Sequence, residues 1–352
     1  MDTYTHHIYC PDYIAGFQCI AGRCRHSCCI GWEIDIDDAS YEKYRKLEGP
    51  LGEKLRANMC PPEDGSSAHF ILGENERCPF LNAKGLCELI LGLGEGSLCE
   101  ICSEHPRFYQ TLSDRTEMGF GLCCEEAARL LISHPAPIRM IDVTSGMKKK
   151  SLFRSKKHFS PELLYEDTFS GSRDDDEAEI LTIRHEIFSI LQDRNLSLGS
   201  RISEIEQNLE LPGTDPDIPY WGAFLGKLER LDPSWDIEIG KLTDKRKIDV
   251  DAFAAMMVVT QRSFEYENFI GYLLYRHLWG ALEDGYIGAR VQFAILAFRL
   301  IEYLGACRFT ENGIFTTEDQ IDLMRMFSSE IEYSDENVDL LIEEILKRDG
   351  AL

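Results

Sequence analysis

Apolar residues beyond residue 159 follow the spacing of amphipathic helices. They recur three or four positions apart over 180–191 and 202–209, which places them on one face of a helix. Two longer apolar stretches, over 250–282 and 287–304, are also predicted to be helical. Helix-start signals stand at Ser160-Pro161, at Thr317-x-x-Gln320 and at Ser334. This part of the chain is therefore predicted to be a helical domain.

The N-terminal part has shorter elements. Residues 33–37 alternate apolar and acidic side chains, which predicts a short half-exposed strand, and 69–72 predicts another. Helices are expected from about residue 38, before residue 93 and over 125–131. The predicted fold is mainly α: a cysteine-rich metal-binding domain with short strands over 1–135, a linker over 136–158 and an α-helical domain over 159–352.

Composition and charge indicate a globular protein that avoids nucleic acid. Hydrophobic residues make up 44% and charged residues 28% of the 352 residues, as in ordinary globular domains. The formal net charge of −24 repels phosphate backbones and attracts basic partners, including lysine-bearing proteins. The one basic run, over 148–157, is too short to reverse this preference.

No membrane or export signal is visible in the sequence. The most apolar stretch, 291–304, is interrupted by Arg299 and Glu302 and is too short to span a bilayer. The first 30 residues lack the continuous apolar core of a signal peptide. We therefore expect a cytoplasmic protein without a membrane partner.

The cysteines are concentrated at one end of the chain. Twelve of the thirteen precede residue 125, and the last, Cys307, is expected to be a buried apolar residue. In a reducing cytosol, such density favours metal ligation over disulfides. Only Cys99-x2-Cys102 has the short spacing of structural zinc sites, so the pattern leaves zinc and an iron–sulfur cluster both open. His26 and His105 could add ligands, although hydrogen-bonded roles are more common for such histidines.

Two tempting motifs fail on inspection. The glycine-rich run over 92–96 follows no hydrophobic strand, so it does not predict a nucleotide loop. Cys24-x3-Cys28 begins like the motif of radical S-adenosylmethionine enzymes, but the third cysteine would fall on Gly31.

The order of the cysteine motifs resembles that of the flagellin lysine-N-methylase family. The resemblance covers roughly residues 10–131 and is more diffuse beyond, where Glu267-Asn268-Phe269 is similar to a Glu-Asn-Tyr element of that family. The CxxxCC and CPF elements are shared with a broader family of zinc- or iron-chelating proteins. The matching elements are Cys19-x4-Cys24-x3-Cys28-Cys29-x-Gly31-Trp32, Cys78-Pro79-Phe80-Leu81-Asn82, Gly85-Leu86-Cys87, Cys102-x-x-x-Pro106-Arg107 and Cys123-x-Glu125.

This resemblance implies N-methylation of lysines in flagellin, or in another lysine-rich protein, with S-adenosylmethionine as methyl donor. It also implies a [4Fe-4S] cluster, with zinc as the alternative. Cys10, Cys60, Cys99 and Cys124 are additions in this chain. The metal ligands carried over from the family pattern are Cys19, Cys24, Cys28, Cys29, Cys78, Cys87, Cys102 and Cys123.

The shared elements also supply candidates for catalysis. Glu125 and Glu267 could remove the proton of a lysine amine, whereas Asn268 is expected to make a buried hydrogen bond. Arg107 is the candidate for cofactor binding, and pairing with a nearby acidic residue is its simpler role. Two other functions stay open: a metal-binding module with a structural centre and no methyltransferase activity, and a redox protein, which would leave the helical part without a task.

Overall fold

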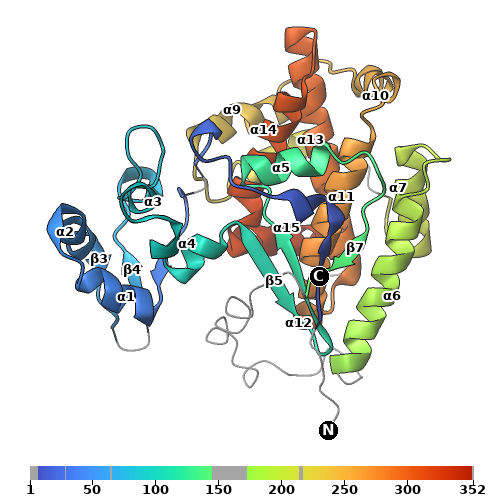
Figure 1. Ribbon diagram of the computed structural model, residues 1–352. Coiled ribbons are helices and arrows are strands. Elements are labelled where there is room, and N and C mark those ends of the chain that lie inside the picture. The colour runs from blue at the N-terminus through green and yellow to red at the C-terminus, as the bar shows by residue number, and fades with distance from the viewer. Residues whose placement is uncertain (1–6, 28, 64–65, 145–172, 214–216, 351–352) are drawn as a thin grey trace.

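Two separate hydrophobic cores organise the protein. The computed structural model describes residues 7–27, 29–63, 66–144, 173–213 and 217–350. A small lobe, built on residues 34–102, projects from a larger helical body (Figure 1). The large core combines the helices with elements near the N-terminus, such as Ile8 and Leu122. The fold is mainly α with short strands in the N-terminal region, as the sequence predicted.

The small lobe is a three-stranded antiparallel sheet with short helices around it. The strand order is β2-β4-β3, and Tyr44, Phe70 and Phe80 are among the fully buried side chains of its core. The Tyr44 hydroxyl donates a hydrogen bond to the Ser97 carbonyl at 2.7 Å. The elements are β2 (Asp35–Ile36), α1 (Asp38–Arg45), α2 (Gly49–Ala57), β3 (Met59–Cys60), β4 (Ala68–Phe70), η3 (Glu74–Glu76), α3 (Glu88–Leu93), η4 (Glu95–Ser97) and α4 (Glu100–Glu104).

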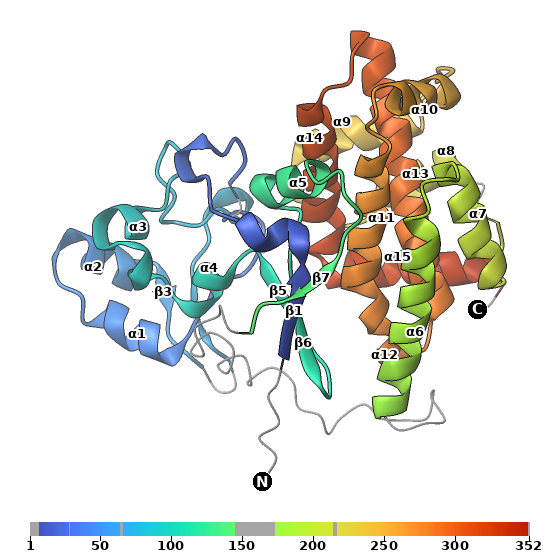
Figure 2. The same cartoon turned by 45° about the vertical axis from the view of Figure 1, so that its right-hand side comes forward.

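A second sheet lies between the small lobe and the helices (Figure 2). Its strand order is β5-β6-β1-β7, in which β1 pairs parallel with β6 and antiparallel with β7. The sheet thereby joins three distant segments of the chain. Its elements are β1 (His7–Pro11), η1 (Asp12–Gly16), η2 (Ala21–Arg23), β5 (Arg107–Thr111), β6 (Arg115–Phe120), α5 (Glu125–Ile132) and β7 (Met140–Asp142).

The helical body is built around α13, which is buried along most of its length. Within the described residues, no helix combines the length and the apolar character needed to cross a membrane. The elements are α6 (Arg173–Leu191), α7 (Leu198–Asn208), α8 (Ile218–Leu225), α9 (Pro233–Leu242), α10 (Val250–Val259), α11 (Phe264–His277), η5 (Leu278–Gly280), α12 (Ala281–Asp284), α13 (Ile287–Asn312), α14 (Thr317–Phe327), the π-helical turn η6 (Ser328–Glu332) and α15 (Asp335–Arg348).

The helical stretch expected over 250–282 consists of α10, α11, η5 and α12. Between α10 and α11 the chain breaks at Gln261, because its left-handed backbone conformation (φ +58°) cannot continue a helix. The capping box of α14 is formed by Thr316 and Asp319, one residue earlier than expected. Ser334 caps α15 as predicted. The helix start expected at Ser160-Pro161 and the basic run over 148–157 lie outside the described residues.

The two cores do not follow the expected division at residue 135. Elements around Ile8 and Leu131 belong to the large core, and β7 lies in the segment expected to be a linker. The reason is the long-range pairing of β1 with β6 and β7, which ties the N-terminal segment to the helical body. The division into domains stays a prediction.

A buried ion pair fixes the second sheet to the helices. The Arg184 guanidinium on α6 donates two hydrogen bonds to the Glu117 carboxylate on β6, at 2.6 and 2.5 Å. Trp279 Nε1 donates to the same carboxylate at 3.0 Å. The two charged side chains are 10% and 3% exposed, so each depends on the other for compensation of its charge.

A buried carboxylate of the π-helical turn η6 binds the backbone of the segment before α9. Glu330 accepts hydrogen bonds from the backbone N–H groups of Leu231 and Asp232, at 2.8 and 2.9 Å. Its burial raises the pKa of the Glu330 carboxyl to about 7. The turn is therefore anchored to the segment that leads into α9.

Substitution Glu117→Gln is expected to lower the free energy of unfolding by about 3–5 kcal/mol, because it leaves the buried Arg184 charge uncompensated. The measurement is urea denaturation followed by circular dichroism. Asp114→Asn is the matched control, since its pair with Arg115 is exposed and its loss should change stability by no more than about 0.5 kcal/mol. Equal effects of the two substitutions would contradict the assignment.

The raised pKa of Glu330 predicts that stability falls as pH rises. The unfolded carboxyl ionises near its ordinary pKa of 4.5, whereas the folded one keeps its proton up to about pH 7. The folded state therefore binds more protons in this window, and the stability that this contributes is lost through pH 7. Between pH 5 and 8, urea denaturation should show a falling free energy of unfolding for the wild type relative to Glu330→Gln. A constant difference between the two proteins across this range would exclude the effect.

Candidate functional site

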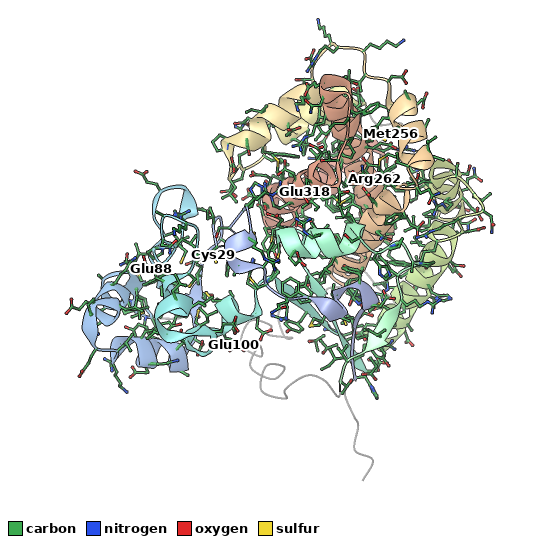
Figure 3. All side chains as sticks on the ribbon, turned by 45° about the horizontal axis from the view of Figure 1, so that its top comes forward. Cys29, Glu88, Glu100, Met256, Arg262 and Glu318 are labelled. Atoms are coloured by element: carbon green, nitrogen blue, oxygen red, sulfur yellow. The ribbon has the colours of Figure 1, made fainter. Side chains whose placement is uncertain are left out.

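Five thiols gather in the core of the small lobe. Cys29, Cys78, Cys87, Cys99 and Cys102 all belong to or pack against its hydrophobic cluster. Each of the last four has a pKa influenced by one or more of the others. All described cysteines are free thiols. In Figure 3, Cys29 lies where the lobe joins the rest of the molecule, with Glu88 and Glu100 farther out on the lobe.

The environment of these thiols disfavours isolated thiolates. Burial raises the pKa of Cys78 to about 12 and also raises that of Cys87. A hydrogen bond with Cys99, together with burial, raises the pKa of Cys102, whereas the same bond lowers that of Cys99. Thiolates bind soft metals and become stable beside a cation. The donor chemistry therefore fits a metal centre.

The described side chains are not assembled around a single ion. No group of three or more His, Cys, Asp or Glu side chains within the described ranges is arranged to hold a metal ion. A structural zinc needs four ligands at about 2.0–2.3 Å. Cys28, one of the eight predicted ligands, lies outside the described residues. The thiols are therefore suitable metal ligands by their chemistry, but the described side chains do not surround a single ion.

The other predicted ligands lie in different surroundings. Burial raises the pKa of Cys124 to about 11, and the nearby Cys24 and Cys19 add to this shift. Cys24 Sγ is 3.7 Å from the Glu125 carboxylate. Cys123 stands beside His105, with Sγ to Nε2 at 3.9 Å. The structure therefore brings together four of the predicted ligands, namely Cys29, Cys78, Cys87 and Cys102, and adds Cys99. Cys60 lies on β3 of the same lobe and is not in this group. Cys10 and Cys307 are buried in ordinary packing.

Glu125 anchors the loop that carries Cys24. Its buried carboxylate accepts hydrogen bonds from the Arg25 backbone at 2.9 Å, from Arg25 Nε at 3.2 Å and from Arg129 at 3.2 Å. Burial alone would raise the pKa of this carboxyl, but the contacts with Arg25 hold it below its ordinary value. A carboxylate engaged in this way positions the loop and is a poor proton acceptor.

Glu267 and Asn268 connect helices to one another. The Glu267 carboxylate pairs with Arg194 at 2.8 Å and with Arg201 at 2.7 Å. Asn268 Nδ2 donates to the carbonyls of Leu131 and His134, at 2.9 and 2.8 Å. The expected buried hydrogen bond of Asn268 is thereby confirmed. The contacts of Glu267 join α11 to the turn between α6 and α7 and to α7 itself.

Arg107 contacts carbonyls and an aromatic ring. Its guanidinium lies 5.0 Å from the centre of the Phe120 ring and donates to the carbonyls of Ser103 and Glu104 at 3.2 and 3.4 Å. These contacts tie the end of α4 to β5. His26, the other histidine considered as a ligand, lies 3.5 Å from the Asp322 carboxylate.

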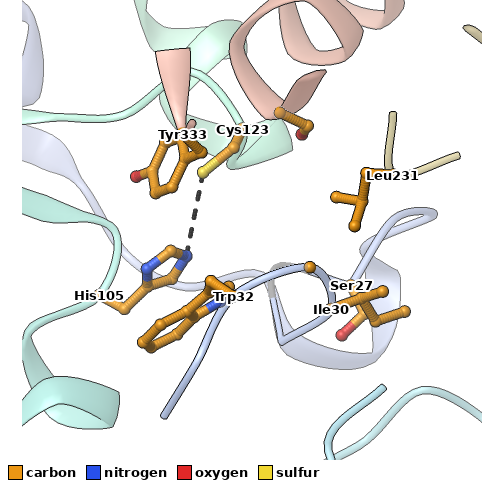
Figure 4. A pocket seen from close by; sticks show the side chains of 9 residues that line it. Ser27, Ile30, Trp32, His105, Cys123, Leu231 and Tyr333 are labelled. Carbon is orange, nitrogen blue, oxygen red and sulfur yellow. Dashed lines mark hydrogen bonds between the residues drawn. The ribbon is translucent and has the colours of Figure 1, made fainter. Parts of the chain in front are cut away.

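A cavity lies where the small lobe meets the helical body (Figure 4). It is small: the room it leaves for water-sized molecules is about 20 Å³. One side comes from the cysteine-motif segments, and the other comes from the helical body. The lining residues are Ser27, Ile30, Gly31, Trp32, His105, Cys123, Leu231, Ser329 and Tyr333.

Aromatic rings form much of the cavity wall. Trp32 and His105 are stacked, with ring centres 4.7 Å apart and planes at 14°. Tyr333 meets His105 edge-on at 5.8 Å. Burial and the charge of Arg276 lower the pKa of His105 to about 4, and burial raises the pKa of Cys123 to about 12. Both groups are therefore neutral near pH 7.

Two glycines allow the walls to approach. Gly31 has φ +91°, and a Cβ there would lie 2.0 Å from Leu231 Cδ2. A Cβ on Gly121 would lie 2.2 Å from the Tyr333 hydroxyl. These positions therefore require glycine, the first for its backbone conformation as well as for space.

Charged groups behind the wall fix Tyr333. The Arg276 guanidinium lies 4.8 Å from the centre of the Tyr333 ring. Glu332, on the adjoining π-helical turn, is hydrogen-bonded to His277 at 2.8 Å. Burial alone would raise the pKa of Glu332, but Arg276 and His277 hold it below its ordinary value. A π-helical turn beside a cavity is a common feature of functional sites.

The sequence pointed to one wall of the cavity only. Trp32, His105 and Cys123 stand in or beside the quoted motifs, but Tyr333 and Ser329 carry no local signal. In the sequence, Tyr333 is simply the residue before the predicted helix cap Ser334. Only its packing against Gly121, more than 200 positions away, reveals its place.

Comparison with known proteins finds similarity to lysine N-methylases. Residues 236–351 match the FliB lysine N-methylase C-terminal domain. A lysine-N-methylase of Salmonella typhimurium is 24% identical over 140 residues, which cover 38% of this chain and 34% of that protein. The flagellar biosynthetic protein FliU of Salmonella muenchen is 25% identical over 150 residues, covering 41% of this chain and 84% of that protein. No solved structure matches the chain significantly.

The domain match lies in the helical body, where the motif resemblance was weaker. It includes Ser329 and Tyr333 of the cavity wall. The aligned stretch spans about a third of the length of the curated lysine-N-methylase. This domain match and these relatives support the resemblance to the flagellin lysine-N-methylase family that the motifs indicated.

Proposed function

We propose that the protein is a protein-lysine N-methyltransferase that acts on flagellin, or on another lysine-rich protein, with S-adenosylmethionine as methyl donor. One observation carries the proposal: the part that matches the lysine N-methylase domain supplies Ser329 and Tyr333 to the cavity whose opposite wall carries Trp32, His105 and Cys123. The cysteine-motif segments and the segment that matches the lysine N-methylase domain thus line the same cavity.

The cavity suits the chemical requirement of methyl transfer. The attacking lysine amine must be unprotonated and in line with the donor methyl group, which S-adenosylmethionine supplies. Ile30, Leu231 and Trp32 give the cavity wall apolar surface, which favours the neutral form of an amine placed beside it. Glu125 and Glu267 are held in buried ion pairs. Their contacts support positioning roles, and their proposed part in proton removal stays a prediction.

The charge of the chain suits a basic substrate. A net charge of −24 raises the local concentration of lysine-bearing proteins and speeds their encounter. The same charge keeps nucleic acid away. The expected cytoplasmic location and the absence of a membrane partner stay predictions.

We propose further that the small lobe holds a [4Fe-4S] cluster, with zinc as the alternative. Four members of the predicted ligand set share the core of this lobe: Cys29, Cys78, Cys87 and Cys102. A cluster is several ångströms wide and takes thiolates that are too far apart for a single ion. That width agrees with neighbouring thiols that do not close around one ion. The cluster would supply iron sites to the lobe. Its part in the reaction is left open.

A second function is supported by the same thiols. They lie in or against the hydrophobic cluster of a small lobe, and small domains often need a metal for stability. The lobe could therefore be a structural metal module in a protein that methylates nothing. Methyl transfer separates this function from the first.

The first prediction concerns activity. Anaerobically purified protein, incubated with methyl-labelled S-adenosylmethionine and purified flagellin, should transfer label to lysine side chains, measured by peptide mass spectrometry. Flagellin whose lysines have been exhaustively dimethylated beforehand is the control and should gain none. Absence of label at every lysine of the untreated flagellin would overturn the proposed activity and favour the structural module.

The second prediction concerns the metal. Cys78→Ser should remove most of the bound iron or zinc, because a hydroxyl is a poor ligand for soft metals. Cys307→Ser is the matched control: it makes the same change at a buried cysteine of α13 and should retain the metal. Metal content and the visible spectrum are measured on both. Loss of metal from both variants, or from neither, would contradict the assignment to the small lobe.

A further inference from the structure

We infer that the metal centre of the small lobe is bound by two pairs of thiols, and that one ligand, Cys99, lies outside the cysteine pattern shared with the family. The inference rests on the metal centre proposed above and adds the identity of its ligands. Each pair is positioned by a different part of the lobe. The four ligands are Cys29, Cys78, Cys99 and Cys102.

The first pair comes from two antiparallel segments. Ile30 forms an antiparallel bridge with Arg77, so the residue before Ile30 lies opposite the residue after Arg77. The Cys78 backbone N–H donates to the Cys29 carbonyl at 3.2 Å, in agreement with this register. Residues opposite each other in such a register have side chains on the same side, with Cβ atoms about 4.5–5.5 Å apart. Cys29 and Cys78 are therefore neighbouring thiols.

The second pair stands at the start of α4. Cys99 immediately precedes the helix and Cys102 lies in its first turn, so the two side chains, three positions apart, are neighbours. The Asp37 carboxylate accepts a hydrogen bond from the Glu100 backbone N–H at 2.9 Å and fixes this end of the helix. A hydrogen bond joins the two thiols and lowers the pKa of Cys99. This pair has the short C-x2-C spacing of metal-binding thiols.

The two pairs lie together in the lobe. Cys78 and Cys99 belong to its hydrophobic core, where they are 7% and 0% exposed, and Cys29 and Cys102 pack against that core. The hydrogen bond with Cys99 and burial raise the pKa of Cys102, and Cys29 and Cys78 are close enough to add to this shift. Cys102 is thus near the other three ligands. Four thiolates is the number that a [4Fe-4S] cluster or a structural zinc takes.

A fifth thiol of the lobe, Cys87, belongs to another turn. This turn is closed by a bridge between Leu81 and Cys87, and Cys87 immediately precedes α3. Burial raises the pKa of Cys87, and backbone N–H groups in the first turn of α3 oppose the shift. Cys29 and Cys99 also lie near Cys87. The two pairs already supply four ligands, so Cys99 takes the place that the family pattern gives to Cys87.

The predicted ligands outside the lobe have other partners. The Cys24 thiol donates to the His26 carbonyl at 2.7 Å, and Cys123 stands beside His105 at the cavity. Cys19 is exposed and is not part of the lobe's hydrophobic cluster. The centre is therefore assigned to the lobe alone.

The experiment compares two serine variants at equivalent positions. Cys99→Ser and Cys87→Ser each replace the residue before a short helix of the lobe. Serine is itself favoured at this position, so both variants are expected to fold. Cys99→Ser should lower the metal content at least about fivefold, because a hydroxyl is a poor ligand for soft metals, whereas Cys87→Ser should keep it. Iron, sulfide and zinc are measured on anaerobically purified full-length protein, and circular dichroism establishes the fold.

A histidine at position 99 gives a spectroscopic test. Cys99→His can keep four ligands, since imidazole binds both iron–sulfur clusters and zinc. If the metal is a cluster, this change should raise its reduction potential and alter the electron paramagnetic resonance of the reduced protein. If it is zinc, the thiolate-to-cobalt absorption of the cobalt-substituted protein should fall by about one quarter, because one thiolate of four is replaced. Cys87→His should leave these properties as in the wild type.

The outcomes separate the ligand assignment from the centre itself. If the wild type holds a metal and Cys99→Ser keeps it in full, or if Cys99→Ser and Cys87→Ser lose it equally, the centre stands and the assignment is overturned. A wild-type spectrum and potential in Cys99→His also overturn the assignment. A wild-type protein that holds neither iron nor zinc overturns the centre and the assignment together. Methyl transfer is not a readout, so the result does not depend on the proposed activity.

Discussion

The close contact between Gly31 and Leu231 is the constraint on which the site depends. No side chain larger than hydrogen fits at residue 31, and its backbone is left-handed. The contact brings the turn after the cysteine motif against the segment before α9. The same turn carries Ile30 and Trp32 into the cavity wall. A single backbone conformation thus sets the separation of the two walls.

Buried carboxylates fix the conformation of the cavity wall that comes from the helical body. Glu330 binds two backbone N–H groups beside Leu231, and Glu332 binds His277 on α11. Both lie on the π-helical turn that presents Ser329 and Tyr333. Burying a carboxylate is expensive unless its partners are well placed. The π-helical turn therefore has a defined shape at the cost of the desolvation of two carboxylates.

Local signals predicted the elements that depend on local chemistry. The alternation over 33–37 and the cap at Ser334 correspond to β2 and to the start of α15. The parallel pairing of residues 7–9 with 115–117 could not be read from the sequence, because strand partners so far apart leave no local pattern. The break at Gln261 was missed because apolar residues continue on both sides of it and no glycine marks the turn. For the same reason the motifs gave Trp32 and His105, but not Tyr333.

A metal centre on the thiols of the small lobe, as proposed above, would be linked mechanically to the cavity. Cys29 belongs to the small-lobe cluster, and Ile30 and Trp32 follow it directly on the same turn. Ligands bound to a metal lose their freedom, and metal-binding energy becomes folding energy of the segments that carry them. A centre on these thiols would therefore order one wall of the cavity whether or not it takes part in chemistry. The structural and the catalytic interpretations of the cysteines are then not exclusive, because a centre that only orders the lobe would still fix the shape of the cavity wall that Ile30 and Trp32 form.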